Sequence, residues 1–290
     1  MNQPRWKIYQ QDLLEKGLVY FFTKRIKKHQ FLRRVWYMFR KPYVMVGSRK
    51  LFINKRDSVV SESLLTTGTW EPTISKIFCM CARKSSTIVD IGGNLGYFTI
   101  LASTVISKTS RVYVFEPETI NFSLLAKSVT ENHLQNVTCE KLAIGNSEGE
   151  ISLYIAEDNF GDHRAFSSGE NRKVETVNMT TLDSYFASYK NPIDLLKIDI
   201  QGFEIQAFQG AKKLLKQGKI RVIMSELWPI GLQMAGSDWR DYIKLLQISN
   251  FSIWEIDDES EKIAPFDPKK LEATIKKDPV FAANIIAILR

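Results

Sequence analysis

Cysteine, histidine and long apolar runs are scarce in this 290-residue chain. It has only three cysteines and three histidines. Cys79 and Cys81 form a C-x-C without a second pair, and Cys139 stands alone, so neither a disulfide framework nor a zinc site is indicated. No apolar run approaches the ~18 residues of a membrane-spanning helix, and the first residues lack a signal-peptide pattern. We therefore expect reduced thiols, no bound metal and a cytoplasmic location.

Positive charge is also scarce beyond the first part of the chain. Residues 1–56 contain 15 Lys and Arg against two acids, whereas residues 57–290 contain 25 against 30. Residues 24–41 combine many of these cations with an apolar face at helical spacing, which is typical of a basic amphipathic helix. We expect this helix to contact an anionic membrane peripherally, to build part of an acceptor pocket, or only to pack on the core. Because the remaining body is acidic, a nucleic-acid partner is not indicated.

From residue 87 onward, short β-rich segments alternate with helical ones. The expected strands of the main sheet cover residues 87–91, 111–116, 137–142, 194–199, 220–226, 251–256 and 282–289. Two further segments, Glu150–Ala156 and Lys173–Met179, alternate like a β-pair around a polar loop. Apolar strands separated by helices predict an α/β fold, with a mostly parallel sheet covered on both faces. We expect residues 1–60 to form a basic, largely helical extension and residues 61–290 to form one domain.

The strongest local signal is a glycine turn between the first expected strand and its helix. It has the pattern D-x-G-x-N-x-G, with Asp90, Gly92, Asn94 and Gly96 at the specified positions. A dinucleotide fingerprint, G-x-G-x-x-G, is not present, because Asn94 occupies the position of its second glycine. Glu116 follows at the end of the second expected strand, where a carboxylate can accept both hydroxyls of a ribose. Turn and acid together predict a nucleoside-containing cofactor other than a dinucleotide.

Several segments together resemble the FkbM-type methyltransferases in order and spacing. They are Gly68–Pro72, Asp90–Thr99, Phe115–Pro117, Leu142–Gly145, Thr180–Asp183, Leu195–Glu204 and the late Asn284. The resemblance implies a class I methyltransferase fold, which is Rossmann-like with a seven-stranded sheet. It also implies S-adenosylmethionine as the methyl donor and O-methylation of a hydroxyl, often on a sugar, a glycan or another metabolite.

The same resemblance implies roles for particular residues. Asp90, Gly92, Asn94 and Gly96 would line the methionine part of the cofactor, Glu116 the ribose, Ala143 the adenine, and Glu71 would add a further cofactor-side contact. One position departs from the family: Gln201 stands where glutamate is usual, so Asp199 lacks an adjacent carboxylate. This departure argues against a role that needs two acids, including metal binding.

Three residues are candidates for the chemistry of the acceptor side. Methyl transfer from a sulfonium requires mainly alignment of the acceptor oxygen and removal of its proton. Asp199, at the end of the fourth expected strand, is either this base or a cap for the following helix. His163, in a polar loop, is either a rival base or merely exposed. Glu226, at the end of the fifth expected strand, is a candidate acceptor contact.

Two alternative functions remain open at this stage. The sequence pI of about 9.2 suggests an RNA methyltransferase, although no aromatic catalytic tetrapeptide such as N-P-P-Y is present. The chain is alternatively a non-catalytic scaffold that retains the cofactor fold. Gln201 favours that alternative, whereas the intact glycine turn and Glu116 oppose it.

Overall fold

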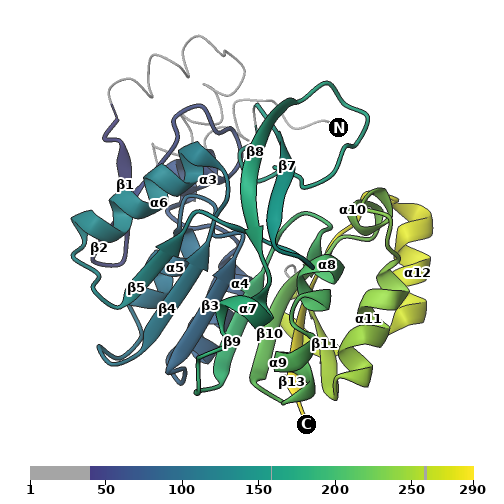
Figure 1. Ribbon diagram of the computed structural model, residues 1–290. Helices are drawn as coiled ribbons and strands as arrows, with labels where there is room; N and C mark the ends of the chain where they lie inside the picture. The colour runs from purple at the N-terminus through teal and green to yellow at the C-terminus, as the bar shows by residue number, and fades with distance from the viewer. Residues whose placement is uncertain (1–39, 158, 258–259) are drawn as a thin grey trace, which may run out of the picture.

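The structure is a computed structural model that describes residues 40–157, 159–257 and 260–290. Its centre is an eight-stranded sheet with the strand order β12-β11-β13-β10-β9-β3-β4-β5. Helices cover both faces of this sheet (Figure 1), so the α/β class predicted from the sequence is confirmed. The amphipathic helix predicted at residues 24–41 lies outside the described residues except for Arg40 and Lys41, and it stays a prediction.

Five parallel strands form the half of the sheet that positions the site. They are β3 (Thr87–Ile91), β4 (Arg111–Phe115), β5 (Val137–Glu140), β9 (Ile193–Ile198) and β10 (Ile220–Leu227). Numbered along the chain, they lie in the order 3-2-1-4-5, so the strand order reverses between β3 and β9. At such a switch point the loops after the two strands diverge, and ligands bind between them.

The remaining strands make the sheet one strand larger than predicted. β13 (Ala283–Leu289) runs antiparallel to both β10 and β11 (Phe251–Asp257), and β11 also pairs with β12 (Lys262–Pro265). The prediction of seven strands missed β12 because its four residues are all exposed and show no apolar alternation. Its lysine and proline suit an edge strand, where they oppose pairing with another chain.

Alternate residues of each strand point to opposite faces and divide the apolar core into two layers. On β3, Ile88 belongs to one layer, whereas Val89 and Ile91 belong to the other. The first layer is closed by α3 (Val60–Thr67), α4 (Pro72–Ala82), α5 (Tyr97–Ser103) and α6 (Thr119–Glu131). The second is closed by α7 (Leu182–Tyr185), α8 (Glu204–Gln209), α9 (Lys212–Lys216), α10 (Pro229–Met234), α11 (Trp239–Ile248) and α12 (Pro268–Lys277). The same alternation places Asp90 and Lys197 in register on the first face.

A small second sheet stands above the main one (Figure 1). It contains β6 (Ala143–Ile144), β8 (Lys173–Thr180) and β7 (Gly149–Ile155), in that order. β7 and β8 pair antiparallel, which confirms the β-pair predicted from the sequence. The loop between them contacts α6, where the Asn121 side-chain amide donates to the Phe160 carbonyl at 2.9 Å. This loop therefore forms a wall above the carboxyl ends of the parallel strands.

The described part of the expected N-terminal extension is a strand pair and not a helix. β1 (Tyr43–Val46) and β2 (Arg49–Phe52) form an antiparallel hairpin. Asn132, after α6, binds this hairpin as a further strand would: its Oδ1 accepts from Lys50 N at 2.9 Å, and its Nδ2 donates to Lys50 O at 2.6 Å. Leu51 is fully buried in the first core layer. Residues before the expected boundary at 60/61 thus pack with those after it, while the boundary itself stays a prediction.

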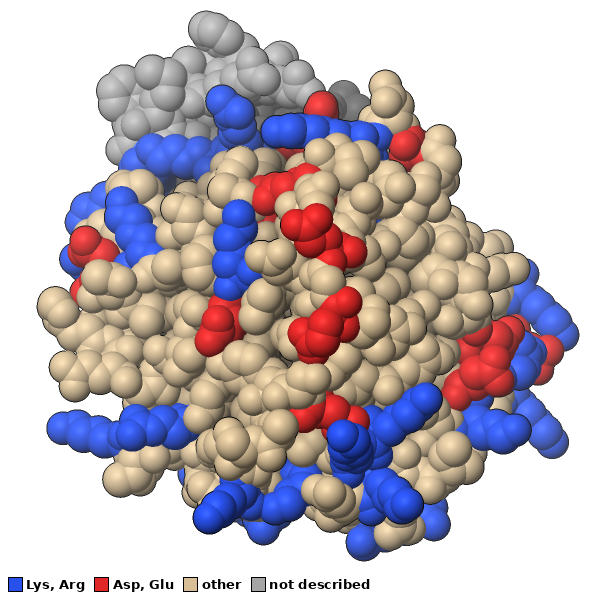
Figure 2. Space-filling view, viewed as in Figure 1, with Lys and Arg blue, Asp and Glu red and all other residues tan. Residues whose placement is uncertain are grey.

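The length of the helices and the distribution of surface charge both concern the partners that the protein could bind. Among the described residues, no helix is both long and apolar enough to cross a membrane. Figure 2 shows acidic side chains following one another down the middle of one face, whereas Lys and Arg gather mainly towards its upper and lower ends. Among the described residues of this face, positive charge does not form a continuous track.

The contacts of Asn132 lead to a prediction about stability. Asn132→Ala should lower the free energy of unfolding by about 1–3 kcal/mol, because the amide and carbonyl of Lys50 lose partners in a partly buried place. Chemical denaturation of the full chain measures this change. Asn146→Ala is the control, since Asn146 is exposed and donates one hydrogen bond to Gln209; its effect should stay within about 0.5 kcal/mol. Equal effects of the two substitutions would contradict the docking role of Asn132.

Candidate functional site

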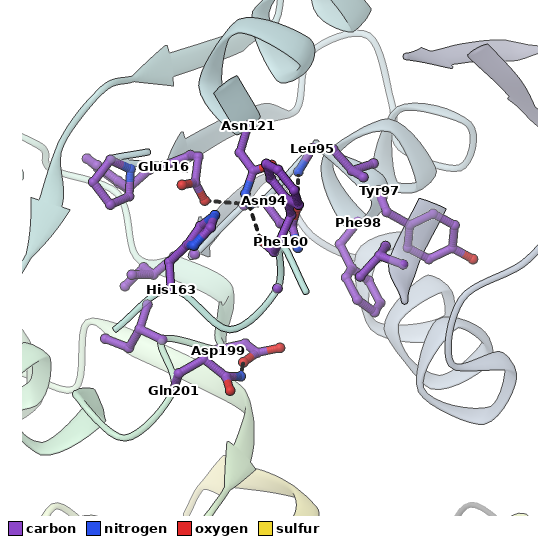
Figure 3. A pocket seen from close by; sticks show the side chains of 18 of the residues that line it. Asn94, Leu95, Tyr97, Phe98, Glu116, Asn121, Phe160, His163, Asp199 and Gln201 are labelled. Atoms are coloured by element: carbon purple, nitrogen blue, oxygen red, sulfur yellow. Dashed lines mark hydrogen bonds between the residues drawn. The ribbon is translucent and has the colours of Figure 1, made fainter. Parts of the chain in front are cut away.

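A cavity of about 250 Å³ opens at the carboxyl ends of the parallel strands. Its walls come from the turns after β3, β4 and β9, from the end of β10, and from the loop between β7 and β8. In Figure 3, Glu116, Asn94 and Phe160 gather on one side, Asp199 and Gln201 lie on the other, and His163 lies between them. The cavity therefore occupies the switch point between β3 and β9, where this sheet order favours a ligand site.

The glycine turn is held between the strands on either side of β3. The backbone N–H groups of Gly92 and Gly93 both donate to the Phe115 carbonyl at 3.0 Å, and Asp199 N donates to the Ile91 carbonyl at 3.0 Å. A Cβ atom on Gly92 would lie 2.0 Å from the Asp199 carbonyl oxygen, and the φ of Gly92 is +77°. Glycine is therefore required here both for its backbone conformation and for the close approach of β9.

Two residues predicted to contact the cofactor lie behind the cavity wall. Asp90 is buried, and its Oδ2 accepts from the Thr99 hydroxyl at 2.8 Å. Gly96 packs so closely on Leu125 of α6 that a Cβ atom would lie 2.7 Å from Leu125 Cδ1. Neither residue lines the cavity. Both support the turn from behind, while Gly92 and Asn94 form the surface that a ligand meets.

Glu116 lines the cavity directly after β4 and has a fixed orientation. Its Oε2 accepts from Asn94 N at 2.7 Å, and its Oε1 accepts from Glu118 N at 2.9 Å. Burial raises the pKa of Glu116 to about 8, although both hydrogen bonds act in the opposite direction. Each carboxylate oxygen keeps a further lone pair, so the side chain can still accept hydrogen bonds from a ligand.

Helix α6 and the loop between β7 and β8 bring a buried acceptor and a buried donor to the cavity. Asn121 is 1% exposed, and its Oδ1 has no hydrogen-bond partner among the described residues. Nε2 of His163 is buried and is likewise without a partner in the described part of the chain. Phe160 packs against the His163 ring edge-on, with ring centres 5.7 Å apart. Unpaired buried polar atoms are costly, so these two atoms indicate where a bound molecule would form hydrogen bonds.

The tautomer of His163 follows from its backbone contact. The Ala156 N–H donates to Nδ1 of His163 at 3.1 Å, and burial lowers the pKa of His163 to about 4. A neutral imidazole that accepts at Nδ1 carries its proton on Nε2. His163 thus presents a proton to the cavity and not a lone pair. The base role predicted for it does not fit this geometry, whereas a hydrogen-bond donor role does.

Two of the acceptor-side candidates, Asp199 and Glu226, are joined by Gln201. Its Nε2 donates to Asp199 Oδ1 at 2.8 Å and to Glu226 Oε2 at 3.1 Å. Burial and the neighbouring carboxylates, with Asp199 the strongest of them, raise the pKa of Glu226 well above its usual value. Gln201 has a φ of +54°, which is uncommon for a residue other than glycine. The turn after β9 therefore fixes Asp199 and Glu226 side by side at the cavity wall.

Lys197 is a cavity residue that the sequence analysis missed. It is 6% exposed on β9, and its Nζ lies 3.6 Å from Asp199 Oδ2. Glu71, predicted to lie on the cofactor side, also lines the cavity and contributes to the carboxylate surroundings of Lys197. The signal for Lys197 was a single lysine inside the apolar strand segment Leu195–Ile198, where burial of a charge needs a specific partner.

Part of the cavity lining is apolar and suits a flat ring. This part includes Ala143, Leu142, Ile144 and Phe115. The residues with unpartnered atoms, Asn121 and His163, line the same cavity. An apolar slot with one acceptor and one donor, next to a carboxylate fixed for hydroxyl groups, matches adenine and ribose in turn. The residues present therefore fit S-adenosylmethionine.

Metal coordination finds little support in the arrangement of side chains. Within the described ranges, no group of three or more His, Cys, Asp or Glu residues is arranged to hold a metal ion. At the one place where Asp199 and Glu226 converge, the amide of Gln201 already donates to both. Absence of a metal remains a prediction, which a chelator can test.

The order of the parallel strands and the cavity at their switch point define the class I fold of S-adenosylmethionine-dependent methyltransferases. The sequence profile of the methyltransferase FkbM domain matches residues 90–251, which is more than half of the chain. The chain therefore belongs to the FkbM methyltransferase family, whose cofactor is S-adenosylmethionine.

Individual relatives are distant. "Methyltransferase 1" of Beauveria bassiana (strain ARSEF 2860) is 21% identical over 145 residues, which cover 43% of this chain and 58% of that protein. The FkbM methyltransferase structure from Methylobacillus flagellatus KT is 16% identical, covers 70% of this chain and 43% of that one, and has a TM-score of 0.43. An O-methyltransferase from Bacillus cereus in complex with SAH is 15% identical, with coverage of 81% and 91% and a TM-score of 0.45.

The close approach at Gly92 leads to a prediction with a matched control. Gly236 has nearly the same φ, +78°, but a Cβ atom there would meet nothing within 4 Å. Gly236→Ala should therefore cost only the backbone strain, about 1–3 kcal/mol. Gly92→Ala should lower the free energy of unfolding by about 1–3 kcal/mol more, because β9 must move away from the turn. Chemical denaturation compares the two variants, and equal losses would show that β9 does not press on the turn.

Proposed function

We propose that this protein is an S-adenosylmethionine-dependent O-methyltransferase that acts on a hydroxyl of a neutral, polyhydroxylated acceptor. Sugars, glycans, glycolipids and hydroxylated secondary metabolites have this chemistry. The observation that carries the proposal is the position of Asp199, which lines the cavity beside the glycine turn and is bound by Gln201 on one carboxylate oxygen. A fixed carboxylate next to the cofactor turn is suited to receive the proton of an acceptor hydroxyl.

The cofactor, when bound, supplies an electrophilic methyl group on a sulfonium sulfur. Gly92, Asn94 and Glu116 would hold this cofactor, and transfer of its methyl to the acceptor oxygen would leave the electron pair of the broken carbon–sulfur bond on sulfur. The acceptor hydroxyl gives its proton to the Asp199 carboxylate. Gln201 holds the carboxylate of Asp199 in place. Glu226 and Gln201 also bind further hydroxyls of the acceptor, so that alignment of the acceptor contributes to the rate together with removal of its proton.

On the cofactor side, we assign Glu116 to the ribose hydroxyls, and Asn121 and His163 to the polar edge of the adenine. Glu116 is fixed by two backbone N–H groups, whereas the other two side chains each offer an unpartnered atom. Gly92 and Asn94 provide the surface for the methionine part, with Ala143 against the adenine ring. Glu71 is assigned to the acceptor end of the cavity, because its charge raises the pKa of both Lys197 and Glu226.

The charge of the cavity argues against the RNA alternative. Four carboxylates, those of Glu71, Glu116, Asp199 and Glu226, line the cavity together with one lysine, Lys197. Affinity for nucleic acid depends on cations placed along the phosphate backbone, and the residues from 40 onward that the structure describes show no continuous track of them on the face in Figure 2. A non-catalytic scaffold is also disfavoured, because a protein without turnover has no need of a carboxylate pair joined by Gln201 beside the cofactor turn.

Glu116 generates a prediction about cofactor affinity and its pH dependence. Glu116→Ala should weaken binding of S-adenosylhomocysteine by roughly 2–4 kcal/mol, because charge-assisted contacts to the ribose are lost. The ionised form accepts from both hydroxyls, and burial raises the pKa of Glu116 to about 8. Affinity should therefore rise about tenfold per pH unit below pH 8 and level off above it. Calorimetry from pH 6 to pH 9 measures both effects.

A matched control for this prediction is Glu118→Gln, which changes the neighbouring acid that caps α6. It should keep the pH dependence of the affinity but move its midpoint to lower pH, because the charge of Glu118 helps to raise the pKa of Glu116. Glu116→Ala should instead give an affinity that hardly changes with pH. An unchanged affinity in a folded Glu116→Ala protein would remove Glu116 from the cofactor site.

Asp199 generates the prediction about mechanism. Asp199→Asn should lower the methylation rate by about 10²–10⁴, the usual size of a general-base contribution, while cofactor affinity changes little. The assay follows labelled methyl groups from S-adenosylmethionine into separated glycan, lipid and RNA fractions. Asp241→Asn, on the exposed side of α11, is the control and should keep the full rate. Chelators should not abolish transfer.

Two results would count against this mechanism. A full rate in Asp199→Asn would mean that alignment alone drives the transfer. Incorporation of label into RNA, and not into the glycan or lipid fractions, would replace the proposed acceptor class.

A further inference from the structure

Lys197 is a buried cation at the cavity whose role is still unassigned. Its strand, β9, directs Leu195 and Lys197 to the face that also carries Asp90 of β3. Phe98 of α5 covers the ammonium group, with its ring centre 4.4 Å from Nζ. A charge in such a place is retained only where partners compensate for lost water.

The compensation comes from acidic neighbours. Burial alone would lower the pKa of Lys197, but surrounding carboxylates outweigh burial and raise it. In decreasing order of influence, these carboxylates belong to Asp199, Asp90, Glu71 and Glu226. Asp199 is both the strongest of them and the one within ion-pair distance, with Oδ2 at 3.6 Å from Nζ.

Asp199 is consequently held at both of its oxygens. Gln201 Nε2 donates to Oδ1 at 2.8 Å, and the ammonium of Lys197 faces Oδ2. The cation and the amide approach from different elements, one from within β9 and one from the turn after it. Each oxygen retains a lone pair that can accept a proton from the cavity.

We infer that Lys197 is a positioning residue that keeps Asp199 ionised and aimed into the cavity, and that this pair sets the lower pH limit of methyl transfer. Without the cation, the charged groups that act on Asp199 would all be acids, namely Asp90, Glu226 and Glu204. Mutual repulsion among carboxylates favours their protonated forms. A protonated Asp199 could not receive the proton of an acceptor hydroxyl. The inference rests on the role proposed for Asp199.

The test measures the protonation of Asp199 directly in the full-length protein. The aspartate carboxyl carbons are labelled with ¹³C, and Asp199→Asn identifies the Asp199 signal by its loss. In Lys197→Met, a neutral side chain of similar length, the titration midpoint of this signal should rise by about 1–3 pH units. Lys197→Arg keeps the charge, and its midpoint should remain close to that of the native protein. An unchanged midpoint in Lys197→Met would overturn the inference.

A second measurement covers the case in which Lys197→Met does not fold. In the native protein, the ¹⁵Nζ signal of Lys197 should change with pH through the same midpoint as the Asp199 carboxyl carbon. A ¹⁵Nζ signal of Lys197 that does not change over the pH range in which Asp199 titrates would overturn the inference as well.

These readouts separate the inference from the proposed function. If Asp199→Asn keeps full methyl transfer while the midpoint depends on Lys197, the proposed function fails and the pairing stands. If Asp199→Asn is inactive but Lys197→Met leaves the midpoint unchanged, only the inference fails.

Discussion

The arrangement of this site depends on one close contact, between the glycine turn after β3 and the first residue after β9. Gly92 can lie against the Asp199 carbonyl only because it lacks a side chain. Hydrogen bonds from Gly92 and Gly93 to Phe115, and from Asp199 to Ile91, lock the same three strand ends together. The contact thus sets Glu116 on one side of the turn and Asp199 on the other. The proposed cofactor and acceptor sites are held apart and in register by backbone packing.

The second constraint is the charge that collects on the acceptor side. Where the family usually has glutamate, Gln201 places an amide between Asp199 and Glu226 and donates to both. A carboxylate in its place would add repulsion where this chain has two hydrogen bonds. Together with Lys197, the amide allows a group of acids to remain close to one another beside the cavity. This arrangement suits an uncharged acceptor rich in hydroxyl groups.

Local sequence patterns predicted much of the fold, but they could not predict contacts between segments that are distant in the sequence. The glycine turn, Glu116 and the pairing of β7 with β8 were readable because each depends on a short stretch of residues. Strand β12 was missed because its four residues are exposed and lack alternation. The tautomer of His163 depends on a backbone N–H seven residues away, and the place of Lys197 depends on acids from four separate segments. Such properties arise only when the chain has folded.

The most direct test of the account is where S-adenosylmethionine attaches when it is crosslinked to the protein by ultraviolet light. Label from the cofactor should appear in the tryptic peptides 85–108 and 112–127, which contain the glycine turn and Glu116. An excess of S-adenosylhomocysteine should suppress it. Label confined to peptides that do not line the cavity, or label that persists under competition, would contradict the claim that the cavity at the switch point between β3 and β9 is the cofactor site.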